Sequence, residues 1–328
     1  MRRRKLTAEQ YIKEIKSGNR FALSQAITLA ESRLVKDQDT AKEVIDKLLS
    51  TTGRSIRIGI TGVPGVGKST FIDQFGILLI QLGHKVAVLS VDPSSQQSGG
   101  SILGDKTRMH QLSLHPEAYI RPTAAGSQLG GVAQQTREAI LLCEAAGYNI
   151  IIVETVGVGQ SETMVRNMTD FFLLLMLGGA GDELQGMKRG IVEMADALAI
   201  NKADGNHRDL AQLAKRNYEQ ALHLFPPPQD KPGPKVFTCS ALENRGLNEI
   251  WLFIEKFINQ SKKTQYFQRN RQQQQQYWMY ELINQQLTQD FFQHDTIKQM
   301  LPQIQKGVID SKITPRDGVE RLLKSYQR

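Results

Sequence analysis

The feature that most constrains this chain is a glycine-rich loop between a strand-like segment and a helix-like segment. Residues 62–69 read G-V-P-G-V-G-K-S, which matches the phosphate-binding pattern G-x-x-x-x-G-K-[ST]. The apolar segment Ile56–Ile60 precedes the loop, and Thr70–Phe75 follows it with helical character. In this order of elements, backbone N–H groups surround a phosphate and the helix N-terminus adds partial positive charge. The sequence therefore predicts a nucleotide-binding α/β domain.

The residues of this loop have distinct expected roles. We expect Lys68 to reach the β- and γ-phosphates and Ser69 to hold Mg²⁺. The nucleotide-binding residues expected from the motif are Gly62, Val63, Pro64, Gly65, Val66, Gly67, Lys68, Ser69 and Thr70.

A second motif indicates which base the nucleotide carries. Asn201-Lys202-Ala203-Asp204 follows an apolar segment, as N-K-x-D does in guanine-binding proteins. Asp204 would accept hydrogen bonds from guanine N1–H and the 2-amino group, which adenine lacks as a pair, so GTP and GDP are favoured over ATP. The Lys202 stem would lie along the base, and Asn201 would brace the loops. Ser240 and Ala241 resemble the last guanine loop, in which a backbone N–H meets the base oxygen.

Acidic residues at predicted strand ends are candidates for the metal and for hydrolysis. Glu154-Thr155-Val156-Gly157 stands in the place of D-x-x-G, where the Gly157 N–H would contact the γ-phosphate. We expect Glu154 to act on Mg²⁺ through water or to orient the attacking water. Asp92 ends a predicted strand and is a metal candidate, whereas Asp105 is equally compatible with a helix N-cap. The candidate catalytic residues are thus Lys68, Glu154, Asp92 and Asp105, and the candidate metal residues are Ser69, Asp92, Asp105 and Glu154.

The residue after Gly157 bears on the rate of hydrolysis. GTPases that use a switch glutamine carry it directly after this glycine, but here the position is Val158 and Gln160 comes two residues later. The sequence therefore predicts slow intrinsic hydrolysis that a partner accelerates.

The rest of the chain predicts one large domain with helical appendages. Near-continuous apolar segments alternate with helix-like patterns, which predicts a mostly parallel sheet flanked by helices on both faces. We expect an N-terminal helical extension over residues 1–50, a P-loop domain over 51–260 and a C-terminal helical arm over 261–328. Thr7 has capping-box spacing with Gln10, and the glutamine run 272–276 is expected to be helical. The expected strands after the first are Val86–Val91, Ile150–Val153, Phe171–Leu177, Ala197–Ile200 and Val236–Thr238.

Composition narrows the compartment and the partners. The formal net charge is +8, which we interpret mainly as solvated surface charge, with an acidic partner as the alternative. The basic residues form no stripe interleaved with aromatics, so nucleic acid is not an expected partner. Cys143 and Cys239 form no Cys-x-x-Cys pair, and the longest apolar run, Phe171–Leu177, is too short to span a bilayer. We expect a cytoplasmic protein that is neither secreted nor membrane-embedded.

Several longer blocks resemble one known family. The stretches D-P-S-S…S-G-G-S-I-L-G-D-K-T-R-M, within Val91–Met109, and E-T-V-G-V-G-Q-S-E, over Glu154–Glu162, are similar to those of the MeaB/ArgK-type GTPases. These are methylmalonyl-CoA mutase-associated proteins, grouped with metallochaperone P-loop GTPases. The resemblance covers about residues 10–260 well and the tail loosely.

The resemblance implies a homodimeric cytoplasmic GTPase that gates adenosylcobalamin delivery to a cobalamin-dependent acyl-CoA mutase and protects it. It implies metal or hydrolytic roles for Asp92, Asp105 and Glu154, a further switch over 181–188, and an adenosyltransferase as an additional partner. Methylmalonyl-CoA mutase is the default partner, and isobutyryl-CoA-type mutases stay open. The family's older label, a kinase of amino-acid transport, is not favoured by the guanine motif.

Two other functions remain as alternatives. A metal-insertion GTPase for a nickel or cobalt enzyme would require a His- or Cys-rich tract, whereas the six histidines here are scattered. A binding protein in which GTP is only structural would show no turnover even with its partner present.

Overall fold

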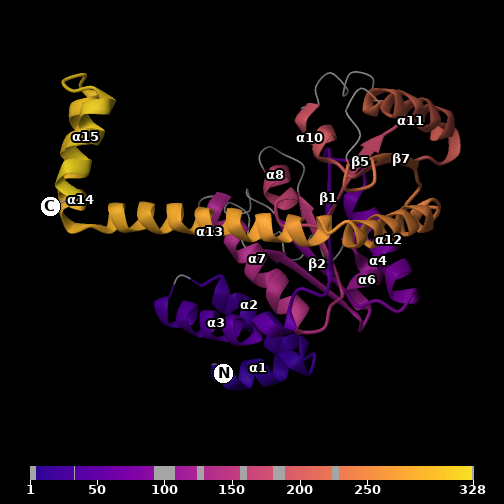
Figure 1. The fold of residues 1–328 in the computed structure, drawn as a ribbon, viewed down its shortest axis with the longest axis horizontal. Coiled ribbons are helices and arrows are strands. Elements are labelled where there is room, and N and C mark those ends of the chain that lie inside the picture. Colours follow the sequence, from indigo (N-terminus) through magenta and orange to yellow (C-terminus); the bar gives the residue numbers. More distant parts are fainter. Residues whose placement is uncertain are drawn as a thin grey trace. The chain divides into compact units, whose positions relative to one another are not determined.

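The chain folds into two compact units, residues Met1–Gln274 and Gln275–Arg328 (Figure 1). The computed structural model describes residues 5–32, 34–91, 108–123, 129–155, 161–179, 189–223 and 229–326. The first unit holds the sheet and its covering helices, and the second unit is helical. The domain boundaries expected from the sequence, near residues 50 and 260, stay a prediction.

The first unit is built on a seven-stranded parallel sheet with the strand order β3-β2-β4-β1-β5-β6-β7. This arrangement confirms the predicted α/β class with a parallel sheet. All the strands expected from the sequence are present, with their ends shifted by at most two residues. The strands are β1 Ile56–Gly62, β2 Val86–Val91, β3 Ala118–Thr123, β4 Ile150–Thr155, β5 Phe171–Leu177, β6 Ala197–Asn201 and β7 Lys235–Thr238.

Strand β3 was not expected from the sequence. It contains Pro122, which has no N–H to donate and therefore argues against a central strand. The structure places β3 at the edge of the sheet, paired on one side only with β2, where Ser90 lies opposite Pro122. An edge position tolerates the missing donor, so a proline there does not exclude a strand.

Helices cover both faces of the sheet, and alternate strand residues point to opposite faces. The helices are α1 Ala8–Lys16, α2 Arg20–Ala30, α3 Val35–Leu48, α4 Lys68–Gln81, α6 His110–Leu114, α7 Leu129–Ala145, α8 Ser161–Arg166, α10 Arg189–Met194, α11 Arg208–Leu222, α12 Leu247–Lys263, α13 Tyr266–Gln293, α14 Asp295–Ile309 and α15 Pro315–Tyr326, with 3₁₀ turns η1 Leu49–Thr51 and η3 Gly205–His207. In Figure 1, α7 and α8 lie on the opposite side of the strands from α4 and α6.

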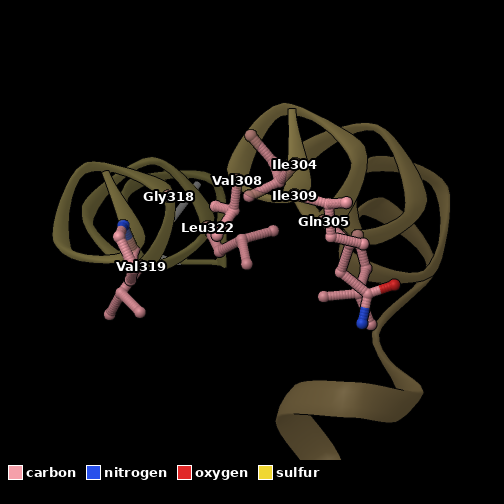
Figure 2. A pocket seen from close by; sticks show the side chains of 9 residues that line it. Ile304, Gln305, Val308, Ile309, Gly318, Val319 and Leu322 are labelled. Carbon is pink, nitrogen blue, oxygen red and sulfur yellow. The ribbon is translucent and has the colours of Figure 1, made fainter. Parts of the chain in front are cut away.

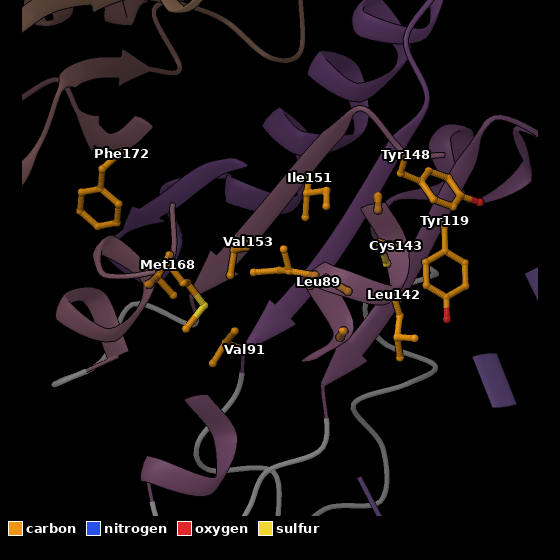
Figure 3. Close-up of a cluster of buried hydrophobic side chains, with 14 of the residues drawn as sticks. Leu89, Val91, Tyr119, Leu142, Cys143, Tyr148, Ile151, Val153, Met168 and Phe172 are labelled. Carbon is orange, nitrogen blue, oxygen red and sulfur yellow. The ribbon is translucent and has the colours of Figure 1, made fainter. Parts of the chain in front are cut away.

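Two buried clusters form the core, one on each face of the sheet. One cluster joins strand residues such as Leu89 and Ile151 to Leu142 and Cys143 of α7 (Figure 3). The other joins Ile58 and its neighbours to α4, α6 and α12, with the Trp251 side chain fully enclosed. Because both faces are covered, the strands read as continuous apolar runs rather than alternating ones.

The N-terminal helices are part of the first cluster. Thr7 caps α1 through the expected capping box with Gln10. Tyr11, Ile15 and Leu23 are buried with the α7 side of the sheet, so these helices support the fold by packing. The sequence predicts a third N-terminal helix near Thr40–Ser50, whereas α3 starts five residues earlier, at Val35.

Residues 272–276 lie within α13, which confirms the helix expected for the glutamine run. The part of α13 up to Gln274 belongs to the first unit, and the rest belongs to the second unit with α14 and α15. No helix in the described ranges is long and apolar enough to cross a membrane.

Candidate nucleotide-binding site

The predicted site residues gather at the carboxyl edge of the sheet. The glycine loop joins the end of β1 to the start of α4, Glu154 lies in β4, and Asn201 ends β6. The strands β4 and β6 reach this edge because they run parallel to β1, and Glu154 pairs with Ile60 in the register of β1 and β4. Ligands of open α/β sheets bind outside this edge, so the topology places the candidate residues where a nucleotide would bind.

Lys68 is held at the root of the loop. Its side chain is buried, and its Nζ donates to the carbonyl oxygens of Gly62 at 2.7 Å and Val63 at 3.3 Å. Burial lowers the pKa of Lys68 below its usual range, and the nearby carboxylates of Glu154 and Glu162 oppose that shift. A lysine held at the loop, with only neutral carbonyls as hydrogen-bond partners in the described residues, can present its charge to a phosphate.

Asn201 joins the glycine loop to the guanine motif, as the sequence predicted for a bracing residue. Its Nδ2 donates to the carbonyl of Val66 at 2.9 Å, and its Oδ1 accepts from the backbone N–H of Ala241 at 3.2 Å. Gly67 permits this contact, because it has φ 91° and a Cβ there would lie 2.9 Å from Asn201 Nδ2. The phosphate and base elements are therefore coupled through one buried side chain.

The residues expected to read the base lie beside this brace. Asp204 is half-buried, and its Oδ2 accepts from the hydroxyl of Ser240 at 2.5 Å, which orients the carboxylate. Lys202 is exposed and has φ 58°, a left-handed conformation unusual for lysine. The backbone N–H groups of Ser240 and Ala241 donate to Arg245 O and Asn201 Oδ1, respectively. The base-contacting roles expected for these two residues thus stay predictions.

The donor set at the end of β4 fits a magnesium ion bound with a nucleotide. Glu154 is buried, and Ser69 lies in the first turn of α4. Hydroxyl and carboxylate oxygens, together with phosphate oxygens and waters, are the ligands that Mg²⁺ prefers. The hydroxyls of Thr61 and Thr155 are 2.7 Å apart and tie the ends of β1 and β4 together next to this donor set.

Other expected positions of the site lie outside the described residues. These are Asp92, Asp105, Gly157, Val158, Gln160 and the segment 181–188. Of the remaining loop residues, Val66 is buried, Pro64, Gly65 and Thr70 are exposed, and Val63 is partly buried. The roles expected for all of these positions stay predictions.

Two further residues lie near the site, and the sequence motifs predict no role for either of them. Arg245 donates to the carbonyl of Ala203 and forms a backbone bridge with Ser240, so it holds the two base loops together. Glu162 is buried on α8, close enough to Lys68 to affect its pKa. Glu162 had a signal in the sequence, since it closes the block E-T-V-G-V-G-Q-S-E, whereas nothing local distinguished Arg245.

Further chemistry in the described part of the chain is limited. Both cysteines are free and buried. Among the described residues, no group of three or more His, Cys, Asp or Glu side chains is placed to hold a metal ion by itself.

Comparisons with known proteins agree with this geometry. A family model described as "Methylmalonyl Co-A mutase-associated GTPase MeaB" matches residues 23–296. GTPase ArgK of Escherichia coli K12 is 44% identical over 321 residues, which cover 98% of this chain and 97% of that protein. The mouse mitochondrial methylmalonic aciduria type A homolog is 41% identical over 320 residues, which cover 94% of this chain and 77% of that protein. The crystal structure of a LAO/AO transport system kinase matches with a TM-score of 0.76 and 37% identity, covering 98% of both chains.

Proposed function

The chain belongs to the MeaB family of methylmalonyl-CoA mutase-associated GTPases, and from this premise we propose that it is a GTP-hydrolysing metallochaperone. It gates adenosylcobalamin delivery to a cobalamin-dependent acyl-CoA mutase of the methylmalonyl-CoA type and protects that enzyme. The observation that carries the GTP-dependent part is the Asn201 brace, which couples the phosphate loop to the guanine motif. The mutase part is supported by the family's name alone.

The residues of the site have separable tasks in this proposal. Lys68 moves its charge from the loop carbonyls to the β- and γ-phosphates, and Asp204, oriented by Ser240, accepts the two guanine N–H donors. Mg²⁺, when bound, neutralises phosphate charge and orients the γ-phosphate, and Ser69 and Glu154 would hold it. Asp92, Asp105 and Gly157 complete the proposed set for metal and γ-phosphate.

Hydrolysis is proposed to be slow until the mutase binds. Val158 stands where other GTPases carry a water-orienting glutamine, so the chain alone lacks that side chain at that position. Turnover then reports that the mutase is present, which suits a timing signal for cofactor loading rather than energy for transport.

We also propose that the protein is a cytoplasmic homodimer that associates through its C-terminal unit, with an adenosyltransferase as a further partner. In that unit an apolar groove of about 450 Å³ lies between α14 and α15, where Figure 2 shows Ile304, Val308 and Leu322. Ile309, which also lines the groove, is 81% exposed. Apolar surface of this kind, together with the exposed apolar residues of α13 in the same unit, fits a second copy of the same chain. Light scattering should give a dimer mass for the wild type and a monomer mass for Ile309→Glu. Leu252→Glu, at an exposed leucine of α12, should remain dimeric.

The central experiment is a GTPase assay with and without the purified mutase. We expect slow hydrolysis of GTP, little hydrolysis of ATP, and acceleration by the mutase. Lys68→Ala should abolish hydrolysis in both conditions while the protein stays folded by circular dichroism. ATP hydrolysis as fast as GTP hydrolysis would contradict the proposal, and tight nickel or cobalt binding by the nucleotide-free protein would favour the metal-insertion alternative.

A further inference from the structure

Glu162 carries a buried carboxylate oxygen that has no hydrogen-bond partner among the described residues. The residue is 3% exposed, and within the part of the chain that the structure describes no donor lies within hydrogen-bond distance of its enclosed Oε2. Burying an ionised oxygen without a partner is unfavourable, so native proteins rarely keep such a group without a use. A donor that arrives with a ligand would remove this penalty.

The packing of α8 directs Glu162 toward the nucleotide site. Helix α8 lies directly against β1 at Gly59, where a Cβ would come within 2.9 Å of Val165 Cγ1 and 3.0 Å of Thr169 Oγ1. Glu162 precedes Val165 by three residues and shares that helix face. The chain leaves the carboxyl end of β4 before α8 and enters the amino end of β5 after it. The first turn of α8, with Glu162, is therefore the part nearest the carboxyl edge and the glycine loop.

The charge at this edge points to a cation. Lys68 is within electrostatic range of both Glu154 and Glu162. One ammonium and two carboxylates give these three buried side chains a net charge of −1. A negative cluster repels bare phosphate, whereas it attracts a divalent cation that arrives together with the phosphates.

We propose that Glu162 is a positioning residue for magnesium, and that its Oε2 accepts a hydrogen bond from a water in the metal's hydration shell. Mg²⁺ keeps several waters when it binds through few carboxylates, and groups that hydrogen-bond those waters fix the shell. Glu154 and Glu162 then approach the metal site from β4 and α8. This role rests on the proposed function, because it requires a nucleotide–magnesium complex at the glycine loop.

The test separates magnesium binding from nucleotide binding. The affinity for fluorescent mant-GDP is measured in excess EDTA and over a Mg²⁺ titration, for the wild type, Glu162→Gln and Glu138→Gln. Glu162→Gln keeps the side-chain shape and removes the charge. We therefore expect the Mg²⁺ concentration that produces half of the maximal change in mant-GDP affinity to rise about tenfold or more. The affinity in EDTA should not fall, because the substitution removes a negative charge near the phosphates. Glu138→Gln removes a half-buried charge on α7 whose carboxylate pairs with Gln134, and it should alter neither value.

Each other outcome has a defined meaning. Unchanged Mg²⁺ dependence in Glu162→Gln overturns the inference. An equal loss of mant-GDP affinity with and without Mg²⁺ also overturns it, because Glu162 would then act by positioning Lys68 or the glycine loop and not the metal. Failure of the wild type to bind mant-GDP would instead refute the proposed GTPase function. If Glu162→Gln does not fold, Glu162→Asp retains the charge one methylene further from the metal and should weaken the Mg²⁺ effect in the same way.

Discussion

The anchor of α13 in the first unit offers the sharpest prediction about stability. Arg271 is buried, and its guanidinium donates to both carboxylate oxygens of Asp170 at 2.8 and 2.7 Å. It also donates to the carbonyls of Gly53 and Ser55, both at 2.7 Å, and stacks 4.4 Å from the centre of the Phe267 ring. One side chain thus joins the start of α13 to the segment before β1 and to the residue before β5.

The expected loss follows from burial. Removing one partner of a buried ion pair destabilises a protein by about 3–5 kcal/mol, because the other charge stays buried without its counterion. Asp170 keeps a hydrogen bond from the backbone N–H of Arg57 at 2.8 Å, so we expect the lower part of that range. Arg271→Ala should reduce the free energy of unfolding by about 3–4 kcal/mol.

Urea denaturation followed by circular dichroism measures this loss. The matched control is Arg269→Ala, two residues earlier on the same helix, whose pair with Asp230 is 54% and 44% exposed. An exposed pair contributes about 0–1 kcal/mol, so the control should change little. Adding Asp170→Asn to Arg271→Ala should cost less than the sum of the two single changes, because the unpaired buried charge is removed. Equal losses for the Arg271 and Arg269 variants would refute the assignment of a buried anchor.

Three further predictions concern the site and the thiols. Gly67→Ala should destabilise the protein by about 1–3 kcal/mol and weaken GDP binding, whereas Gly83→Ala shares the positive φ but meets no atom within 4 Å and should leave GDP binding intact. Asp204→Asn should lower the preference for GTP over ATP by about 100-fold in competition binding, and an unchanged preference would contradict the base-reading role. Burial raises the pKa of Cys239 to about 12, so folded protein at pH 8 should resist a thiol reagent that labels both cysteines in urea. Between about pH 9 and 12 the unfolded Cys239 thiol ionises while the folded one keeps its proton, so this thiol alone should lower the free energy of unfolding as pH rises, by up to about 1.4 kcal/mol per pH unit.

The sequence predicted most of the sheet because its strands are buried on both faces. Phe171–Leu177 and Val86–Val91 read as continuous apolar runs, and their order with the intervening helices specified parallel pairing. Strand β3 is not among the strands predicted from the sequence; Pro122 is unfavourable in a central strand, and only the strand order shows that β3 lies at an edge. The early start of α3 was missed for a local reason, since Leu34 at its N-cap makes no side-chain cap to mark the boundary.

The parts of the site that could be predicted from the sequence are those formed by short motifs of adjacent residues. The glycine loop and Asn201–Asp204 predict phosphate and guanine binding from a few adjacent residues, and the bracing role expected for Asn201 agrees with its contacts. The sequence did not indicate that the Ala241 N–H donates a hydrogen bond to Asn201 Oδ1, because the two residues are 40 positions apart in the chain. The motif indicates which residues meet, whereas the folded loops decide which hydrogen bonds are satisfied within the protein.

The parallel sheet, the glycine loop and the N-K-x-D motif could all be predicted from the sequence, because hydrophobic periodicity and loop chemistry act over a few neighbouring residues. The folded protein alone shows that Glu162 is buried with an oxygen that has no partner among the described residues, and that Arg271 pairs with Asp170 across 101 residues. Desolvation and ion pairing depend on which distant elements exclude water from a side chain. That exclusion exists only after β1, α8 and the start of α13 have packed together.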